Sequence, residues 1–166
     1  MKHKETMTAF QRVMTALEHK EPDRVPFSLP ATLHGAKELG VSIQEYFSKA
    51  EYVVEGQIRL GAKYRHDVAS GAFYTALEFE AWGGEVIYYD DGPPNSGEPI
   101  IRTPEDILSL EPPRVKDTRC LHKALEAIRR LKSKVGGEMP IVGVVISPFS
   151  LPVMQMGFAQ YFDLMH

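Results

Sequence analysis

Six side chains are the strongest candidates for contact with a small-molecule substrate, and they fall in three stretches of the sequence. They are His34, Tyr74, Glu78, Ser147, Phe149 and Ser150. Imidazole, phenol, carboxylate and hydroxyl groups can bind polar atoms of a substrate. Each stretch follows an apolar run that is typical of a strand, and the sites of parallel α/β proteins lie at the carboxyl ends of their strands. We therefore expect a substrate site to be formed by these three stretches.

Two of these candidates keep a second interpretation. His34 either faces a substrate or forms a local hydrogen bond in its loop, and the sequence favours neither. Glu78 lies one helical turn from Tyr74, so its carboxylate either faces the site or belongs to a solvated helix face together with Glu80. The solvated face is the plainer interpretation.

Few other residues suggest chemistry. Asp67 lies in a predicted strand, where a buried carboxylate needs a partner, and Arg65 or a backbone N–H is the expected one. Cys120 stands alone near a predicted helix start, which gives its thiol only weak potential for a lowered pKa. The sequence has no glycine-rich nucleotide motif and no histidine or cysteine pair with metal-ligand spacing. We assign no catalytic residue and expect no metal or cofactor held by this chain.

Strands and helices must alternate along the chain to position these residues. Apolar runs predict strands at residues 25–29, 66–71 and 140–146, and helical spacing predicts the main helices at residues 8–19, 49–60, 73–82 and 118–135. Strands separated by helices indicate an α/β fold with parallel strands and right-handed crossover helices. Since no linker interrupts residues 1–166, we predict a single domain.

Three strands are too few to close a barrel. The sheet is therefore either small and open or part of a larger barrel. The last helix is predicted to continue to His166 without a capping residue, a glycine or a proline, which favours the second alternative.

Composition excludes several classes of protein. The net charge is −3 with both signs mixed along the 166 residues, which argues against a nucleic-acid-binding surface. No apolar run is long enough to span a membrane, and the charged N-terminus does not resemble a signal peptide. A single cysteine cannot form an internal disulfide, so we expect a cytoplasmic protein.

Three short motifs occur in order along the chain. Asp23-Arg24-Val25-Pro26 closes the first predicted helix, Glu-Ala-Trp-Gly-Gly-Glu-Val occupies residues 80–86, and Ser-Pro-Phe-Ser-Leu follows the last strand at residues 147–151. Together these motifs resemble the uroporphyrinogen decarboxylase (URO-D) superfamily. The resemblance extends over nearly the whole chain. It implies a (β/α)8 TIM barrel about twice as long, of which this chain would supply the N-terminal portion, strands one to three.

The chain departs from the decarboxylases of this superfamily at three positions. The resemblance implies two arginines after strand one, which bind the substrate's carboxylates, and the matching positions here are Ala31 and Gly35. Neither residue can form the bidentate contacts of a guanidinium. The aspartate that faces the pyrrole nitrogens in the decarboxylases matches Tyr74, counted nine residues before Gly83. These departures disfavour porphyrinogen decarboxylation.

The methylcobamide:coenzyme M methyltransferases of the superfamily fit better. The resemblance implies transfer of a methyl group from a methylcobamide to a thiol, which a zinc bound in the full-length parent would activate through ligands on later strands. We expect a small-molecule substrate or a corrinoid protein as partner, a homo-oligomer, and no activity from this chain alone. The alternatives are a uroporphyrinogen decarboxylase of porphyrin and haem biosynthesis, which needs no cofactor, and a non-catalytic α/β interaction module.

Overall fold

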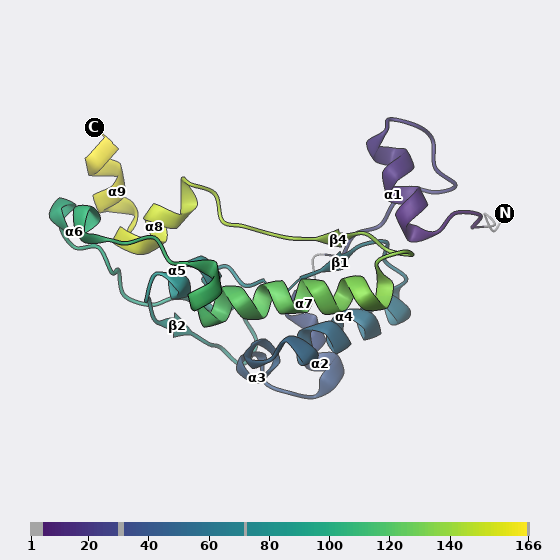
Figure 1. Ribbon diagram of the computed structural model, residues 1–166, viewed down its shortest axis with the longest axis horizontal. Helices are drawn as coiled ribbons and strands as arrows, with labels where there is room; N and C mark the ends of the chain where they lie inside the picture. Colours follow the sequence, from purple (N-terminus) through teal and green to yellow (C-terminus); the bar gives the residue numbers. More distant parts are fainter. Residues whose placement is uncertain (1–4, 30–31, 72, 166) are drawn as a thin grey trace. The chain divides into compact units, whose positions relative to one another are not determined.

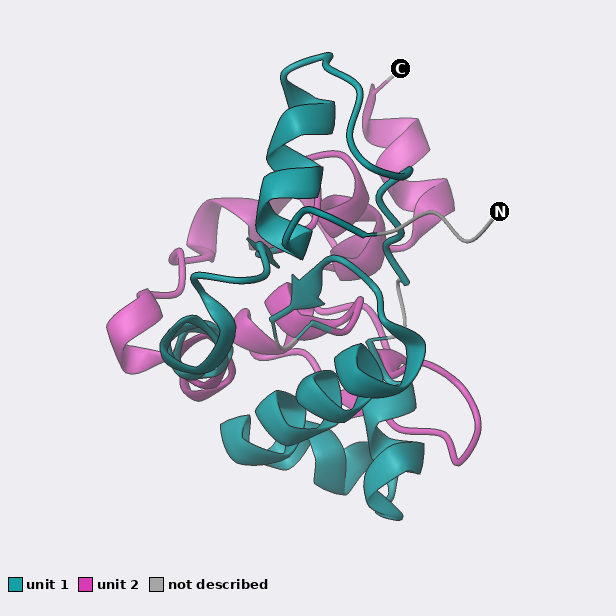
Figure 2. Cartoon of the chain, turned by 90° about the vertical axis from the view of Figure 1, so that its right-hand side faces the viewer, with its two compact units in different colours: residues 1–73, 124–143 teal, residues 74–123, 144–166 magenta. Residues whose placement is uncertain are grey.

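The computed structural model describes residues 5–29, 32–71 and 73–165. The chain divides into two compact units, which are coloured separately in Figure 2. Unit 1 comprises residues 1–73 and 124–143, and unit 2 comprises residues 74–123 and 144–166. A compact unit is not by itself a domain, so the expectation of a single domain over residues 1–166 stays a prediction.

Unit 1 combines helices with a small parallel sheet (Figure 1). Its elements are α1 (Ala9–Leu17), α2 (His34–Leu39), α3 (Ile43–Ser48), α4 (Ala50–Tyr64), β1 (Ala69–Ser70) and β4 (Ile141–Val142). Helix α7 (Arg119–Val135) contributes its residues from 124 onward to this unit and its first turn to unit 2.

The first helix begins where the sequence predicts. The Thr8 side chain accepts a hydrogen bond from the Gln11 backbone N–H at 3.1 Å, and the Gln11 side chain accepts one from the Thr8 N–H at 3.0 Å. This reciprocal capping box pairs two backbone donors that the helix itself leaves free. Ser42 caps α3 in a similar way, through a bond from the Glu45 N–H to its hydroxyl.

The sheet confirms part of the predicted strand order. Strands β1 and β4 pair in parallel, with Ala69 opposite Ile141 and Ser70 opposite Val142. The runs at residues 66–71 and 140–146 are therefore parallel neighbours, as predicted, although each forms only two residues of strand.

The prediction of a strand at residues 25–29 is wrong, because the structure assigns none there. One backbone bond, from the Asp67 N–H to the Phe27 carbonyl at 2.7 Å, joins this run to the residues before β1. Pro26 has no N–H, and the Phe27 N–H binds the Asp67 carboxylate instead of a neighbouring strand. The run therefore lies beside the start of β1 but lacks the donors of a regular ladder.

Helices α2 and α4 approach closely around one buried tyrosine. A β-carbon at Gly35 would lie 2.6 Å from Tyr46 Cζ, and one at Gly56 would lie 2.8 Å from the Gly35 Cα. Both glycines therefore leave room for the Tyr46 ring, which is fully buried. Burial raises the pKa of Tyr46 to about 12, since the charged phenolate would be poorly solvated there.

Unit 2 is mainly helical and contains one hairpin. Its elements are α5 (Leu77–Ala81), β2 (Val86–Ile87), β3 (Asn95–Ser96), α6 (Pro104–Ser109), a 3-10 helix η1 (Val115–Asp117), α8 (Ser150–Met156) and α9 (Phe158–Met165). Strands β2 and β3 pair in an antiparallel arrangement, with Val86 opposite Ser96.

Two details of unit 2 differ from the sequence prediction. Helix α5 begins at Leu77, although the pattern predicts a helix over residues 73–82, because Tyr74 opens a turn whose carbonyl accepts the Leu77 N–H. Strand β3 lies within residues 90–97, where successive aspartate, glycine, proline, asparagine and serine residues predict a loop. In the hairpin, Val86 pairs with Ser96 and Ile87 with Asn95, so the segment is extended where it meets β2.

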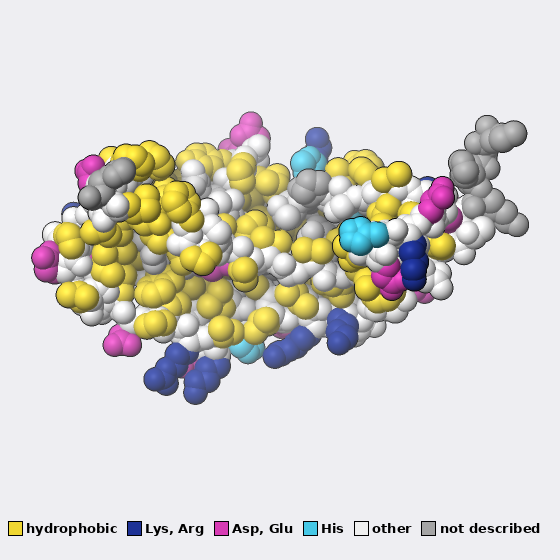
Figure 3. Space-filling view, turned by 90° about the horizontal axis from the view of Figure 1, so that it is seen from above, with side chains coloured by type: hydrophobic (Ala, Val, Ile, Leu, Met, Phe, Trp, Pro, Cys, Tyr) yellow, Lys and Arg dark blue, Asp and Glu magenta, His cyan; other side chains and the backbone are white. Residues whose placement is uncertain are grey.

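No helix in the described part of the chain combines the length and the apolar character needed to cross a bilayer. Exposed hydrophobic side chains are nevertheless frequent, and Figure 3 shows many of them on one face. On α9 they include Phe158, Phe162, Leu164 and Met165, and after β4 the side chain of Val145 is 82% exposed.

Candidate functional site

Glu78 of α5 holds the segment that follows β4. Its Oε1 atom accepts a hydrogen bond from the Ile146 backbone N–H at 3.0 Å, across 68 positions of sequence. The side chain is half-buried, and within the described residues its Oε2 atom is buried without a hydrogen-bond partner. The carboxylate therefore does not lie on a solvated helix face, which was the plainer interpretation of the sequence.

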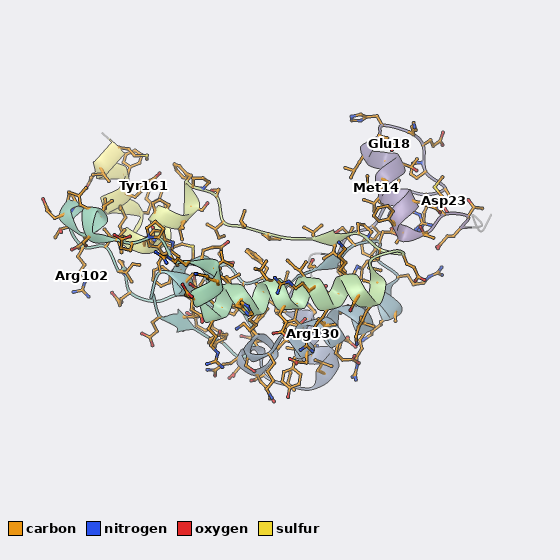
Figure 4. All side chains as sticks on the ribbon, in the orientation of Figure 1. Met14, Glu18, Asp23, Arg102, Arg130 and Tyr161 are labelled. Atoms are coloured by element: carbon orange, nitrogen blue, oxygen red, sulfur yellow. The ribbon has the colours of Figure 1, made fainter. Side chains whose placement is uncertain are left out.

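The turn after Ile146 exposes three of the six predicted site residues. The Ser147 hydroxyl accepts the Ser150 backbone N–H at 3.1 Å and lies 3.0 Å from the Ser150 hydroxyl. Phe149 is 56% exposed, and its ring makes an edge contact with that of Tyr161 on α9. Figure 4 labels Tyr161, whose helix follows α8 directly. The turn thus offers two hydroxyls and an aromatic ring for binding.

Tyr74 is buried, so its phenol does not line an open surface. The side chain is only 2% exposed, and its hydroxyl donates a hydrogen bond to Glu80 Oε2. Burial, together with the Glu80 carboxylate, raises the pKa of Tyr74 far above its ordinary value. Tyr74 therefore remains a neutral hydrogen-bond donor at all physiological pH values, and Glu80 of its own unit is among its partners.

Two further ionisable groups surround Tyr74. The ammonium group of Lys123 lies 5.8 Å from the centre of the Tyr74 ring, and burial lowers the pKa of Lys123 despite the opposing charge of Glu80. The Cys120 thiol faces the Leu77 carbonyl at 3.6 Å, and burial raises its pKa. The thiol is therefore unreactive in this environment, so the weak expectation of a lowered pKa is not met.

His34 is exposed at the start of α2 and belongs to unit 1. The other five predicted site residues belong to unit 2, so a site that joins His34 to them stays a prediction. Gly35 is buried against Tyr46, as described above. Ala31, the other position matched to a substrate-binding arginine, lies outside the described residues.

Sequence reasoning missed a buried cluster of charges in unit 1, the Asp67 cluster, which consists of Arg12, Asp23, Arg24 and Asp67. Arg12 is 2% exposed and binds Asp23 through Nε at 2.6 Å and Asp67 through Nη1 at 2.6 Å. Arg24 binds both oxygens of Asp67, at 2.6 and 2.9 Å. Figure 4 labels Asp23, which lies beside α1, the helix that carries Arg12.

The partners of Asp67 correct one prediction and confirm another. Arg65 does not bind Asp67 but forms an ion pair with Glu5 at 3.0 Å, whereas the predicted backbone donor exists as the Phe27 N–H at 2.7 Å. Burial alone would raise the pKa of Asp67, but its bonds from Arg24, Phe27 and Arg12 hold that pKa below its usual range. The hydrogen bond with Asp23 raises the pKa of Arg12 still further above its ordinary value. Every oxygen of Asp67 is paired, which indicates a structural cluster.

Within the described part of the chain, the predicted site residues form no metal site, and one apolar cavity of unit 2 is lined by other residues. Within residues 5–29, 32–71 and 73–165, no group of three or more His, Cys, Asp or Glu side chains is arranged to hold a metal ion. An apolar cavity of about 220 Å³ lies between α6 and α9, and Ile107, Met156 and Leu164 contribute to its wall. None of the six predicted site residues lines this cavity.

Comparisons with known proteins identify the family and the fold. Residues 8–166 match the family described as uroporphyrinogen decarboxylase (URO-D). Among solved structures, a methyltransferase from Methanosarcina mazei superposes with a TM-score of 0.73 at 19% sequence identity, covering 95% of this chain and 48% of that one. The chain thus spans about half the length of that relative, and none of the curated proteins matches it. The α/β fold with parallel strands and helices, a partial TIM barrel, is therefore confirmed.

Proposed function

The chain belongs to the uroporphyrinogen decarboxylase family, and on this premise we propose that it is part of a corrinoid-dependent methyltransferase, which transfers a methyl group from a methylcobamide to a thiol. The alternative within the family is decarboxylation of uroporphyrinogen. The two reactions need different recognition groups, since a porphyrinogen carries several carboxylates that call for cationic partners.

The observation that carries this proposal is the packing at Gly35. A decarboxylase would place an arginine at this position, but the Tyr46 ring fills the space into which any side chain would project. An arginine here would have to displace a fully buried tyrosine from between α2 and α4. The packing of unit 1 therefore leaves no space for a guanidinium group at position 35.

The surroundings of Tyr74 support the same choice. An anionic side chain at this position would stabilise positive charge on a pyrrole, but Tyr74 is neutral and its hydroxyl binds Glu80. The solved methyltransferase of similar fold is consistent with the proposal. At 19% identity the likeness establishes the fold alone.

In the proposed reaction the thiol sulfur forms a bond to the methyl carbon while the cobalt–carbon bond breaks, with its electron pair remaining on cobalt. The proton of the thiol leaves to solvent or to a base. The residues of this chain would bind and orient the substrates through Glu78 and the exposed turn of Ser147, Phe149 and Ser150. Since the described residues do not fit a zinc ion, no step is assigned to a metal held by this chain.

The proposed partners follow from this reaction. The methyl donor is either free methylcobamide or a corrinoid protein, and the acceptor is a small thiol. We further propose a cytoplasmic protein that associates with copies of itself, because exposed apolar side chains such as Val145 and Phe158 favour association. Sedimentation at micromolar concentration measures that association.

The experiment uses the protein that contains this chain, as its gene encodes it. It is incubated with methylcobalamin and a small thiol, and demethylation is followed through the corrinoid absorbance spectrum. In parallel, uroporphyrinogen is offered and loss of its carboxyl groups is measured by mass spectrometry. We expect methyl transfer and no decarboxylation, and the isolated 166-residue chain is expected to be inactive. Decarboxylation without methyl transfer would establish the alternative.

A further inference from the structure

Glu78 stands out because only half of its carboxylate is used. The Ile146 N–H occupies Oε1 at 3.0 Å, while Oε2 is buried and has no partner among the described residues. A buried acceptor without a partner is destabilising, and such atoms are rare in native proteins. An unpaired carboxylate oxygen therefore calls for a ligand or a function.

Support of the backbone does not by itself explain a carboxylate at this position. A single acceptor oxygen is enough to hold the Ile146 N–H, and the amide of a glutamine would provide one without a charge. By contrast, the Asp67 carboxylate accepts four bonds, from Arg12, from both terminal nitrogens of Arg24 and from the Phe27 N–H. The fold thus pairs the Asp67 carboxylate completely, whereas the buried Oε2 atom of the half-buried Glu78 has no partner among the described residues.

The position of Glu78 joins this free oxygen to the predicted binding turn. Residue 146 immediately precedes Ser147, and the side chains of residues 144, 145, 147 and 149 are exposed. Among the described residues, the segment 143–146 makes one hydrogen bond, the one from Ile146 to Glu78. A segment held by a single bond can shift at small energetic cost, and binding of a ligand at the buried Oε2 atom requires such a shift.

We propose that Glu78 is a substrate-binding residue whose Oε2 atom accepts a hydrogen bond from an N–H or ammonium group of a substrate. This inference rests on the proposed methyl transfer, and it specifies that the site binds substrates with a hydrogen-bond donor. The carboxamide groups of the corrinoid or an ammonium group of the thiol can supply the donor. Carboxylate-bearing molecules are disfavoured, because two carboxylates repel each other at hydrogen-bonding distance.

The first test replaces Glu78 with glutamine in the protein that contains this chain. The glutamine carbonyl still accepts the Ile146 N–H, but an NH2 group takes the place of Oε2. Binding of methylcobalamin and of 2-aminoethanethiol is measured separately by calorimetry, which needs no turnover. We expect affinity for one of them to fall at least about tenfold, with an unchanged melting temperature. The probe that loses affinity identifies the source of the donor.

Glu98→Gln is the matched control, since Glu98 is an exposed carboxylate of the same unit. It should bind both probes as the wild type does. Unchanged affinity for both probes in Glu78→Gln would overturn the inference even if methyl transfer occurs. Conversely, a wild type that binds a probe through Glu78 but transfers no methyl group would refute the proposed reaction and leave the inference standing.

A second test needs no variant, and therefore does not depend on Glu78→Gln folding. Affinities of the wild type are compared within two pairs, 2-aminoethanethiol with 3-mercaptopropionate and cobalamin with one of its monocarboxylic acid derivatives. The donor-bearing member of one pair should bind at least about tenfold more tightly. Equal affinity within both pairs, or failure to bind any of the four molecules, would contradict the inference.

Discussion

The Asp67 cluster of unit 1 and the Glu78 carboxylate of unit 2 differ in how their carboxylate oxygens are hydrogen-bonded. In the cluster, Arg12 and Arg24 pair both oxygens of Asp67, and Asp23 completes the bonds of Arg12. At Glu78, one oxygen holds a backbone N–H and the other has no partner among the described residues. A fully paired carboxylate contributes to stability, whereas an incompletely paired one is available for a ligand. The comparison therefore separates a structural site from a candidate functional one.

The largest effect is expected from Arg12→Met. It removes the charge that binds Asp23 and Asp67 and leaves two carboxylates without their buried partner. Breaking a buried ion pair in this way lowers the free energy of unfolding by about 3–5 kcal/mol. Urea denaturation measures the change. Arg59→Met, which breaks an exposed pair with Glu55, should change it by less than about 1 kcal/mol. Equal small losses in both variants would show that the cluster is not structural.

Acid should weaken the same cluster. The folded pKa of Asp67 lies below its ordinary value, so the unfolded chain binds a proton more readily than the folded one as the pH falls. The stabilisation is fully present above the unfolded pKa of about 3.9 and is lost as the pH falls through the folded pKa. The urea concentration at the unfolding midpoint should therefore decrease in the wild type as the pH is lowered below about 4. The decrease should be less steep in Asp67→Asn. Parallel curves for the two proteins would argue against this linkage.

Tyr74→Phe tests whether Tyr74, unlike Glu78, contributes to the stability of the protein and not to substrate binding. It removes the hydroxyl that donates to Glu80 and leaves that carboxylate without this donor. Loss of a hydrogen bond to a charged group should lower the free energy of unfolding by about 1.5–3 kcal/mol. Affinity for methylcobalamin and for 2-aminoethanethiol should stay unchanged, which is the reverse of the expectation for Glu78→Gln. A loss of binding affinity without a loss of stability would show that Tyr74 binds substrate.

The smallest expected effect is on substrate choice, which Gly35→Arg should leave unchanged. The arginine side chain must displace Tyr46 and place a charged group in a buried site, so the free energy of unfolding should fall by more than the about 1–3 kcal/mol of ordinary overpacking. In the double variant Tyr46→Ala with Gly35→Arg, the arginine side chain has the space of the Tyr46 ring. This variant should recover part of the unfolding free energy that Tyr46→Ala alone loses. Calorimetric titration with uroporphyrinogen should detect no binding by the single Gly35→Arg variant or by the double variant. Micromolar binding of uroporphyrinogen would support the alternative function of a decarboxylase.

Local features of the fold follow from the sequence because their partners are close along the chain. Thr8 and Gln11 form a capping box, and Thr103 with Asp106 forms another at α6. Helical spacing likewise predicts α4 and α7 within a few residues. The apolar run at residues 140–146 predicts β4, and its parallel pairing with β1 follows from the helices between them. The motifs also identify the family, which the match over residues 8–166 confirms.

The tertiary structure decided how the charged and polar groups are paired. Arg12 and Asp67 are 55 positions apart, and Glu78 and Ile146 are 68 apart, so no local pattern indicates either contact. The run at residues 25–29 is as apolar as a strand, but the Phe27 N–H binds Asp67, and this long-range bond competes with strand formation. Tyr74 and Glu78 are one turn apart but have different partners, since Tyr74 binds Glu80, which is close along the chain, whereas Glu78 binds the distant Ile146 N–H. The sequence by itself determined the local elements, the family and the order of the parts, because these depend on neighbouring residues. Only the folded chain decided that Asp67 is fully paired and that Glu78 Oε2 has no partner in the described part of the chain, because burial and partners arise from segments brought together across the sequence.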